Sequence, residues 1–154
     1  MPTPAPPVIR DARSDDADGL QAVFRRSSLA NEHDRPNLER HPDALELPAP
    51  QVDDRVRVAT VHAAIAGFAT VRPTGSALEL VDLFVDPPWM RHGIGHALIA
   101  DAVAFAIEQG HGSLEVTANP HALRFYASEG FVVGHEVETR FGPAPRMRLE
   151  VTTE

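Results

Sequence analysis

The chain has no cysteine, no lysine and no long apolar run. Without cysteine, neither a disulfide framework nor a thiolate metal site can form, and an intracellular location is favoured over secretion. No apolar stretch is long enough to cross a membrane, and the first residues, MPTPAPPVIR, lack the basic region and apolar core of a signal peptide. These absences predict a cytoplasmic protein with no membrane segment.

Positive charge is also scarce. All 14 basic residues are arginines, they form no long cluster, and the formal net charge is −8. An acidic chain without a basic patch cannot neutralise a row of phosphates, so we expect no nucleic-acid partner. The 8 histidines do not fall into the spacing of metal ligands, and we expect no metal site.

The length of 154 residues suits one domain with a substantial apolar core. Proline-rich residues 1–7 are predicted to be a flexible tail, and residues 8–154 to form a single domain. Apolar periodicity and breaker residues predict the elements of this domain. The predicted strands are residues 8–10, 56–62, 68–72, 77–85, 113–117, 131–136 and 147–151, and the predicted helices are residues 15–29, 94–108 and 120–129.

Two connections matter for the site. Residues 64–67 are predicted to be the turn between the second and third strands, and residues 31–54 a loop with one short helix that could act as a substrate lid. A helix joins strands 77–85 and 113–117, so these two strands should run parallel. The order of elements predicts an α+β or mixed α/β sheet with helices on its faces.

The junction between strand 77–85 and the following helix is the most informative segment. Pro87 and Pro88 stop the strand, and Gly93 and Gly95 let the backbone approach a ligand closely where the helix opens. The first N–H groups of a helix have no internal partner and carry the positive end of its dipole. The segment therefore predicts a phosphate or pyrophosphate site, to which the nearby side chains add donors: Arg91, His92 and His96.

The glycine pair allows other interpretations. Gly93 and Gly95 could serve only a tight strand-to-helix turn. A P-loop is excluded because His96 and Ala97 stand where lysine and serine or threonine would follow. A dinucleotide-binding fingerprint fits only in part, since Leu98 occupies the place of its third glycine.

The junction, together with a second segment, resembles the GCN5-related N-acetyltransferase family. The family pattern Gln/Arg-x-x-Gly-x-Gly/Ala corresponds to Met90-Arg91-His92-Gly93-Ile94-Gly95, with Met90 departing from the usual polar residue. The pattern Asn-x-x-Ala-x-x-Phe-Tyr-x-x-x-Gly-Phe is matched at every specified position from Asn119 to Phe131. The resemblance covers residues 56–151 well and the first strand and helix more loosely.

The resemblance implies a fold and a co-substrate. The fold is a mixed, mostly antiparallel sheet with helices on both faces and one splayed parallel strand pair. The co-substrate is acetyl-CoA, with its pyrophosphate on the amides of the glycine loop and its pantetheine arm along main-chain groups of the preceding strand. The cofactor-binding residues implied are Leu83, Phe84, Val85, Arg91, His92, Gly93, Ile94, Gly95, His96 and Asn119.

Catalytic roles follow from the same resemblance. A helix tyrosine such as Tyr126 would ordinarily be a core residue with its hydroxyl at the rim. In the family the matching tyrosine is the general acid for the departing thiolate, a task that suits a phenol with a pKa near ~10. Glu79 and Asp82 are the candidate bases. Alternation along the strand puts these two on opposite faces, and each could instead be a solvated or paired carboxylate.

We therefore predict an N-acetyltransferase that moves an acetyl group from acetyl-CoA to a primary amine of a small molecule or peptide. Attack is direct, in a ternary complex, because a chain without cysteine cannot form an acyl-cysteine. The alternative is a non-catalytic acyl-CoA-binding sensor or interaction domain on the same fold, and a Rossmann domain is the least favoured. The resemblance allows a homodimer, and the acceptor should be selected by the first helix, residues 31–54 and the turn predicted at residues 140–145.

Overall fold

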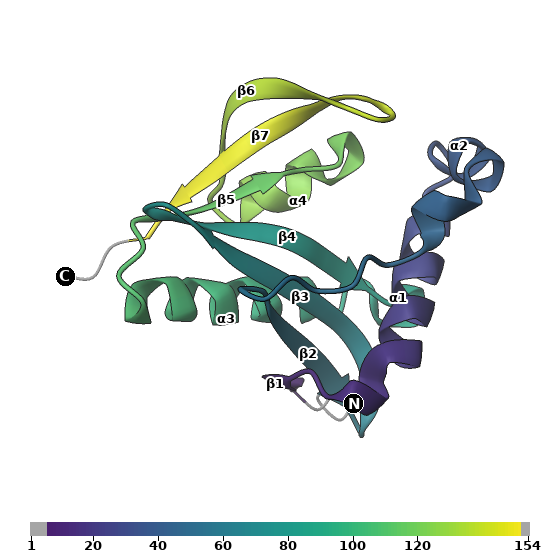
Figure 1. Ribbon diagram of the computed structural model, residues 1–154, viewed down its shortest axis with the longest axis horizontal. Helices are drawn as coiled ribbons and strands as arrows, with labels where there is room; N and C mark the ends of the chain where they lie inside the picture. Colours follow the sequence, from purple (N-terminus) through teal and green to yellow (C-terminus); the bar gives the residue numbers. More distant parts are fainter. Residues whose placement is uncertain (1–5, 152–154) are drawn as a thin grey trace. The chain divides into compact units, whose positions relative to one another are not determined.

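The computed structural model describes residues 6–151, so residues 1–5 of the predicted tail lie outside the described part. Figure 1 shows the strands and helices that these residues form. The strands are β1 (Val8–Asp11), β2 (Arg55–Val61), β3 (Ala64–Thr74), β4 (Ala77–Val85), β5 (Ser113–Thr117), β6 (Val132–Thr139) and β7 (Gly142–Glu150). The α-helices are α1 (Ala17–Leu29), α2 (Arg35–Arg40), α3 (Ile94–Glu108) and α4 (Leu123–Ser128). Short 3₁₀ turns are η1 (Ser14–Asp16), η2 (Pro42–Leu45), η3 (Pro87–Trp89) and η4 (Pro120–Ala122).

The strands form a seven-stranded sheet in the order β1-β2-β3-β4-β5-β7-β6. Strands β4 and β5 pair in parallel, whereas β1 with β2, β5 with β7 and β6 with β7 pair antiparallel. The prediction of a mostly antiparallel sheet with one parallel pair is confirmed. Helix α3 connects the two parallel strands, as a parallel connection requires.

Contacts divide residues 6–151 into two compact units. Of these residues, the first unit contains those up to Thr70 together with Asp82–Leu98, and the second contains Val71–Val81 and those from Ile99 onward. In the first unit, the apolar face of α1 packs on the sheet through Leu20 and Val23, which join Val58 and Phe68 in one buried cluster. Spacing of three along the helix puts Leu20 and Val23 on the same face.

The turn between β2 and β3 differs from the prediction. It lies at His62 and Ala63, with φ of 51° and 66°, and β3 already begins at Ala64. Positive φ at both central residues is the geometry of a type I′ hairpin, whose usual asparagine and glycine are missing from this sequence. Gly67, which suggested the turn, lies inside β3, where an added Cβ would be 2.7 Å from the Phe84 carbonyl oxygen and 3.0 Å from Ile94 Cγ2. It is needed for close packing.

In the second unit, β6 and β7 form a long hairpin beside β5 (Figure 1). Both strands exceed their predicted bounds, and the turn predicted at residues 140–145 is wrong because β7 begins at Gly142. Pro143 and Pro145 pair with Glu138 and Glu136 on β6. The register of β7 with β5 ends at Arg146, so at these prolines β7 is paired only with β6. A strand position with a partner on one side tolerates a missing N–H.

The predicted loop of residues 31–54 contains two short helical segments, α2 and η2. Gln21 of α1 anchors residues 45–47 of this segment with both polar atoms of its amide. Nε2 donates to the Leu45 carbonyl at 2.6 Å, and Oε1 accepts from the Leu47 N–H at 2.8 Å. Leu45 is buried and Leu47 packs against the α1 cluster. This part of the segment is therefore held in place, which does not favour a freely moving lid at residues 45–47.

Candidate active site

The junction after β4 forms an ordered turn before α3. Trp89 N–H donates to the Asp86 carbonyl at 2.8 Å, and the chain then passes through Arg91 and Gly93, both in the left-handed region with φ of 65° and 79°. The first helical hydrogen bond runs from Ala97 N–H to the Gly93 carbonyl. The amides at the very start of α3 therefore precede the helical bonding pattern, and their dipoles favour an anion.

Space over this turn suits a bulky anion. A Cβ added at Gly93 would meet nothing within 4 Å, and Arg91, His92 and His96 are all exposed. The His92 Nδ1 atom lies 2.8 Å from the Met90 carbonyl oxygen, which can only accept, so Nδ1 carries a proton in this arrangement. The His92 ring also meets Trp89 edge to face, with centroids 5.9 Å apart.

The preceding strand leaves part of its backbone unpaired with its parallel neighbour. The register of β4 with β5 runs from Ala77 and Ser113 to Glu79 and Glu115 and stops there, although β4 continues to Val85. Strand β5 therefore takes no part in bonding the backbone of Leu83, Phe84 and Val85. The Phe84 side chain packs in the core, against Phe24 at 4.9 Å and Phe68 at 5.7 Å between centroids, so only its main chain is available for the predicted role.

Tyr126, the only tyrosine, lies on α4 in the second unit and is 6% exposed. Its ring meets Phe125 and Phe131 edge to face, with centroids 5.2 Å and 5.3 Å away. Among the described residues no buried side-chain oxygen or nitrogen lacks a partner, and Tyr126 makes no side-chain hydrogen bond there, so its hydroxyl oxygen keeps access to solvent. Burial of the ring raises the pKa of the phenol above its usual 10.0. The side chain is an embedded ring with an accessible proton.

Asn119 has the predicted capping role. Its side-chain oxygen accepts from the His121 N–H at 3.4 Å, and Pro120 follows at the first position of η4. The expected helix at residues 120–129 thus begins as a 3₁₀ turn and becomes α4 at Leu123.

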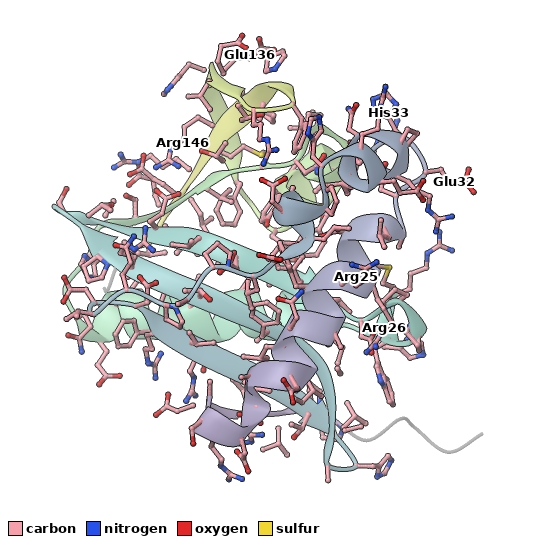
Figure 2. All side chains as sticks on the ribbon, turned by 45° about the vertical axis from the view of Figure 1, so that its right-hand side comes forward. Arg25, Arg26, Glu32, His33, Glu136 and Arg146 are labelled. Carbon is pink, nitrogen blue, oxygen red and sulfur yellow. The ribbon has the colours of Figure 1, made fainter. Side chains whose placement is uncertain are left out.

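The Glu79 carboxylate forms an ion pair, which was one of the roles considered for it from the sequence. Arg146 of β7 donates from Nη1 to Glu79 Oε2 at 2.7 Å, and from Nη2 to the other oxygen. The same Nη1 donates to Thr117 Oγ1 at 3.0 Å. The hydrogen bond that it donates to Glu79 raises the pKa of the Arg146 guanidinium, which stays charged. Figure 2 labels Arg146, which the sequence did not single out.

The structure thus brings the loop residues together in the first unit, where Asp82 is half-buried on β4. Glu79, Asn119 and Tyr126 belong to the second unit. Sequence reasoning did not find the ion pairs of Arg146 with Glu79 and of Arg26 with Asp86. Their partners are 67 and 60 residues apart, and no local pattern marks such pairings.

Comparison with known proteins identifies the family. A sequence model described as the acetyltransferase (GNAT) domain matches residues 39–151, which is most of the chain. The chain belongs to the GNAT acetyltransferase family. Acetyl-CoA is the co-substrate of this family.

A curated relative is the mycothiol acetyltransferase of Clavibacter sepedonicus, 27% identical over 142 residues. The match covers 83% of this chain and 43% of the relative, so the chain spans less than half of that protein. No helix among residues 6–151 is both long and apolar enough to traverse a membrane.

Solved GNAT structures share the fold. A GCN5-related N-acetyltransferase from Rhodopseudomonas palustris has a TM-score of 0.78 and 21% identity, covering 97% of this chain and 99% of that one. The PaiA N-acetyltransferase of Thermoplasma acidophilum, in complex with coenzyme A, has a TM-score of 0.74 and 20% identity, with 95% and 99% covered. The ribosomal-protein-S18-alanine N-acetyltransferase of Escherichia coli has a TM-score of 0.71 and 19% identity, with 96% of each chain covered. At such identities the likeness is one of fold.

Proposed function

We propose that this protein transfers an acetyl group from acetyl-CoA to a primary amine of a small molecule or peptide. The observation that carries the proposal is Tyr126, whose ring is buried while its hydroxyl remains accessible and protonated. A core tyrosine can have the same geometry, and the match of Tyr126 to the family motif is what supports a catalytic role for its proton. An acyltransferase that releases a thiolate can use such a proton.

The start of α3 fits the pyrophosphate of the co-substrate. Arg91 and Gly93 turn the chain so that the amides of Ile94 and Gly95 precede the first helical bond, and the space above Gly93 is open. Backbone donors at the positive end of a helix dipole hold phosphate oxygens without any particular side chain. Met90, which departs from the family pattern, is therefore compatible with binding.

Arg91, His92 and His96 are exposed beside these amides and supply the side-chain donors for the phosphates. Main-chain groups of Leu83, Phe84 and Val85 hold the pantetheine arm, and one of their N–H groups stabilises the developing oxyanion. Asn119 adds a hydrogen bond to the coenzyme besides its capping bond.

The reaction forms one bond and breaks one. The amine nitrogen attacks the thioester carbonyl carbon, the N–C bond forms, and the C–S bond breaks with its electrons passing to sulfur. Tyr126 donates its proton to that sulfur, which leaves as the thiol. The raised pKa of Tyr126 keeps the phenol protonated at neutral pH, and the proton released by the amine returns to the tyrosinate through solvent.

An amine with a pKa near ~10 must first lose a proton, for which Glu79 and Asp82 remain the candidates. Both oxygens of Glu79 accept from Arg146, so its lone pairs are engaged in the structure described. The pH dependence of kcat/KM separates the two candidates. The true base is the one whose amide variant, Glu79→Gln or Asp82→Asn, loses the acidic limb of the profile.

The acceptor is a primary amine in this proposal because the related proteins named above include N-acetyltransferases, one of them acting on a ribosomal-protein alanine. The test is release of free thiol from acetyl-CoA in the presence of a panel of small amines and peptides with free N-termini, with calorimetry of coenzyme A binding in parallel. Amine-dependent thiol release with a mass gain on the acceptor is the expected result. Binding without thiol release for any amine would instead support an acyl-CoA sensor.

A further inference from the structure

A salt bridge joins helix α1 to the end of strand β4. Arg26 donates to both carboxylate oxygens of Asp86, from Nε and from Nη2, each at 2.8 Å. The Asp86 side chain is 10% exposed and that of Arg26 is 53% exposed. Both residues belong to the first unit, and Figure 2 labels Arg26 on α1. The proposed reaction uses neither of them, so the pair needs another explanation.

Asp86 occupies a position where an aspartate side chain ordinarily caps the helical turn that follows. It is the N-cap of η3, and an aspartate there usually accepts a bond from the next N–H groups. Its side chain makes no such bond and turns to Arg26. Its backbone is fixed as well, because its N–H donates to the Ala66 carbonyl at 2.8 Å and its carbonyl accepts from Trp89 at 2.8 Å. Asp86 is thus held from β3, from η3 and from α1.

The chain between Asp86 and the glycine turn has little freedom to absorb a shift. Pro87 and Pro88 follow Asp86 directly, and proline restricts its own φ. Beneath the junction, Gly67 approaches so closely that an added Cβ would overlap the Phe84 carbonyl and press on Ile94. A displacement of Asp86 would therefore be passed on to residues 91–95.

Helix α1 touches the end of β4 at a second point. The Phe24 ring meets the Phe84 ring edge to face at 4.9 Å, two residues before each member of the ion pair. The apolar contact sets the distance between helix and strand but does not fix a direction. The two-point bond between Arg26 and Asp86 does fix one, because a guanidinium and a carboxylate are both planar.

We propose that Arg26 is a positioning residue for coenzyme A: through Asp86 it holds the turn that presents the amides at the start of α3. This inference rests on the proposed role of that turn in binding the pyrophosphate. Arg26 touches no reacting atom, and its effect is on cofactor affinity.

The test compares two arginine pairs of the same kind. Arg26→Lys keeps the charge but loses the planar two-point bond, and we expect the Kd for coenzyme A, measured by calorimetry, to rise about fivefold to tenfold. The matched control is Arg10→Lys. Arg10 donates to both oxygens of the buried Asp16, from Nη1 at 2.7 Å and Nη2 at 3.0 Å, in the same unit but at the opposite end of α1 from Arg26. This control should lose thermal stability to a similar degree and keep the wild-type Kd.

A second variant, Asp86→Asn, preserves the shape of the side chain and removes its charge, and it should weaken coenzyme A binding as Arg26→Lys does. Hydrogen exchange without ligand gives an independent readout, since the amides of residues 89–95 should exchange faster in both variants than in Arg10→Lys. Suppose that the wild-type protein binds coenzyme A. If Arg26→Lys and Asp86→Asn then bind it equally well, or if Arg10→Lys weakens binding as much as they do, this inference alone is overturned. A wild-type protein that does not bind coenzyme A overturns the proposed function and this inference with it.

Discussion

The turn before α3 and the segment around α4 present different chemistry to a ligand. The turn is exposed, contains residues at positive φ and offers main-chain N–H groups. The α4 segment embeds the ring of Tyr126 between two other aromatic rings and offers the hydroxyl of Tyr126. A site made of backbone tolerates changes of side chain but not of backbone conformation. A site made of one side chain behaves in the opposite way, and variants of each should therefore affect different kinetic constants.

The largest expected effect comes from Tyr126→Phe. The phenyl ring keeps the packing with Phe125 and Phe131, while the proton donor disappears. We expect kcat to fall about 100-fold, within the range typical of general acid catalysis, with the Kd for coenzyme A changed less than about twofold. Steady-state kinetics and calorimetry measure the two quantities. Equal turnover in both proteins would remove Tyr126 from the proposed mechanism.

The turn should respond to an added side chain through binding. Gly93→Val places a branched side chain where the backbone faces the anion, and the loss of one bond to a charged oxygen would raise the Kd for coenzyme A about tenfold or more. Gly75→Val is the matched control, because Gly75 also has a positive φ, of 63° against 79°, and open space around its Cβ position. Both variants carry the same kind of backbone strain. Equal coenzyme A affinity in the two would show that the space over Gly93 is not used.

The difference between the regions also explains what the sequence could predict. Strand 77–85, helix 94–108 and strand 113–117 match the observed bounds, because proline or glycine lies within two residues of each of them. The turn at His62 was missed since neither it nor Ala63 is a usual residue for positive φ.

The ion pairs were beyond local prediction for another reason. Asp86 has the sequence position of a cap, and only the fold brings it to an arginine 60 residues away. Glu79 likewise depends on Arg146, on a strand whose prolines concealed its length. Motifs identify the residues that a family uses. The contacts that orient those residues are tertiary and join parts of the chain that are far apart in sequence.

A smaller effect is expected at the entrance to α4, where the two kinds of site overlap. Asn119→Ala removes a capping bond that is long, at 3.4 Å, so stability should fall by about 0.5–1 kcal/mol. Ser128→Ala is the control, because Ser128 donates to the Phe125 carbonyl at 2.6 Å at the other end of α4. If Asn119 also bonds the coenzyme, only Asn119→Ala weakens coenzyme A binding, and a thermal melt with calorimetry separates the two roles. A Kd unchanged by Asn119→Ala would leave Asn119 with capping alone.

The titration of Tyr126 has the smallest expected effect at neutral pH. It also reports most directly on the environment of this side chain. Because the chain has a single tyrosine, the absorbance of tyrosinate reports this residue alone. Burial raises its pKa in the folded protein above 10.0, so above that pH the unfolded chain releases a proton that the folded chain retains. The free energy of unfolding should therefore be unaffected below about pH 9 and should fall as the pH rises past 10, an alkaline loss that Tyr126→Phe lacks. A tyrosine pKa of about 10 in the folded protein would show that the ring is not embedded. The contrast between an exposed backbone site and a buried side-chain site would then not hold for the α4 segment.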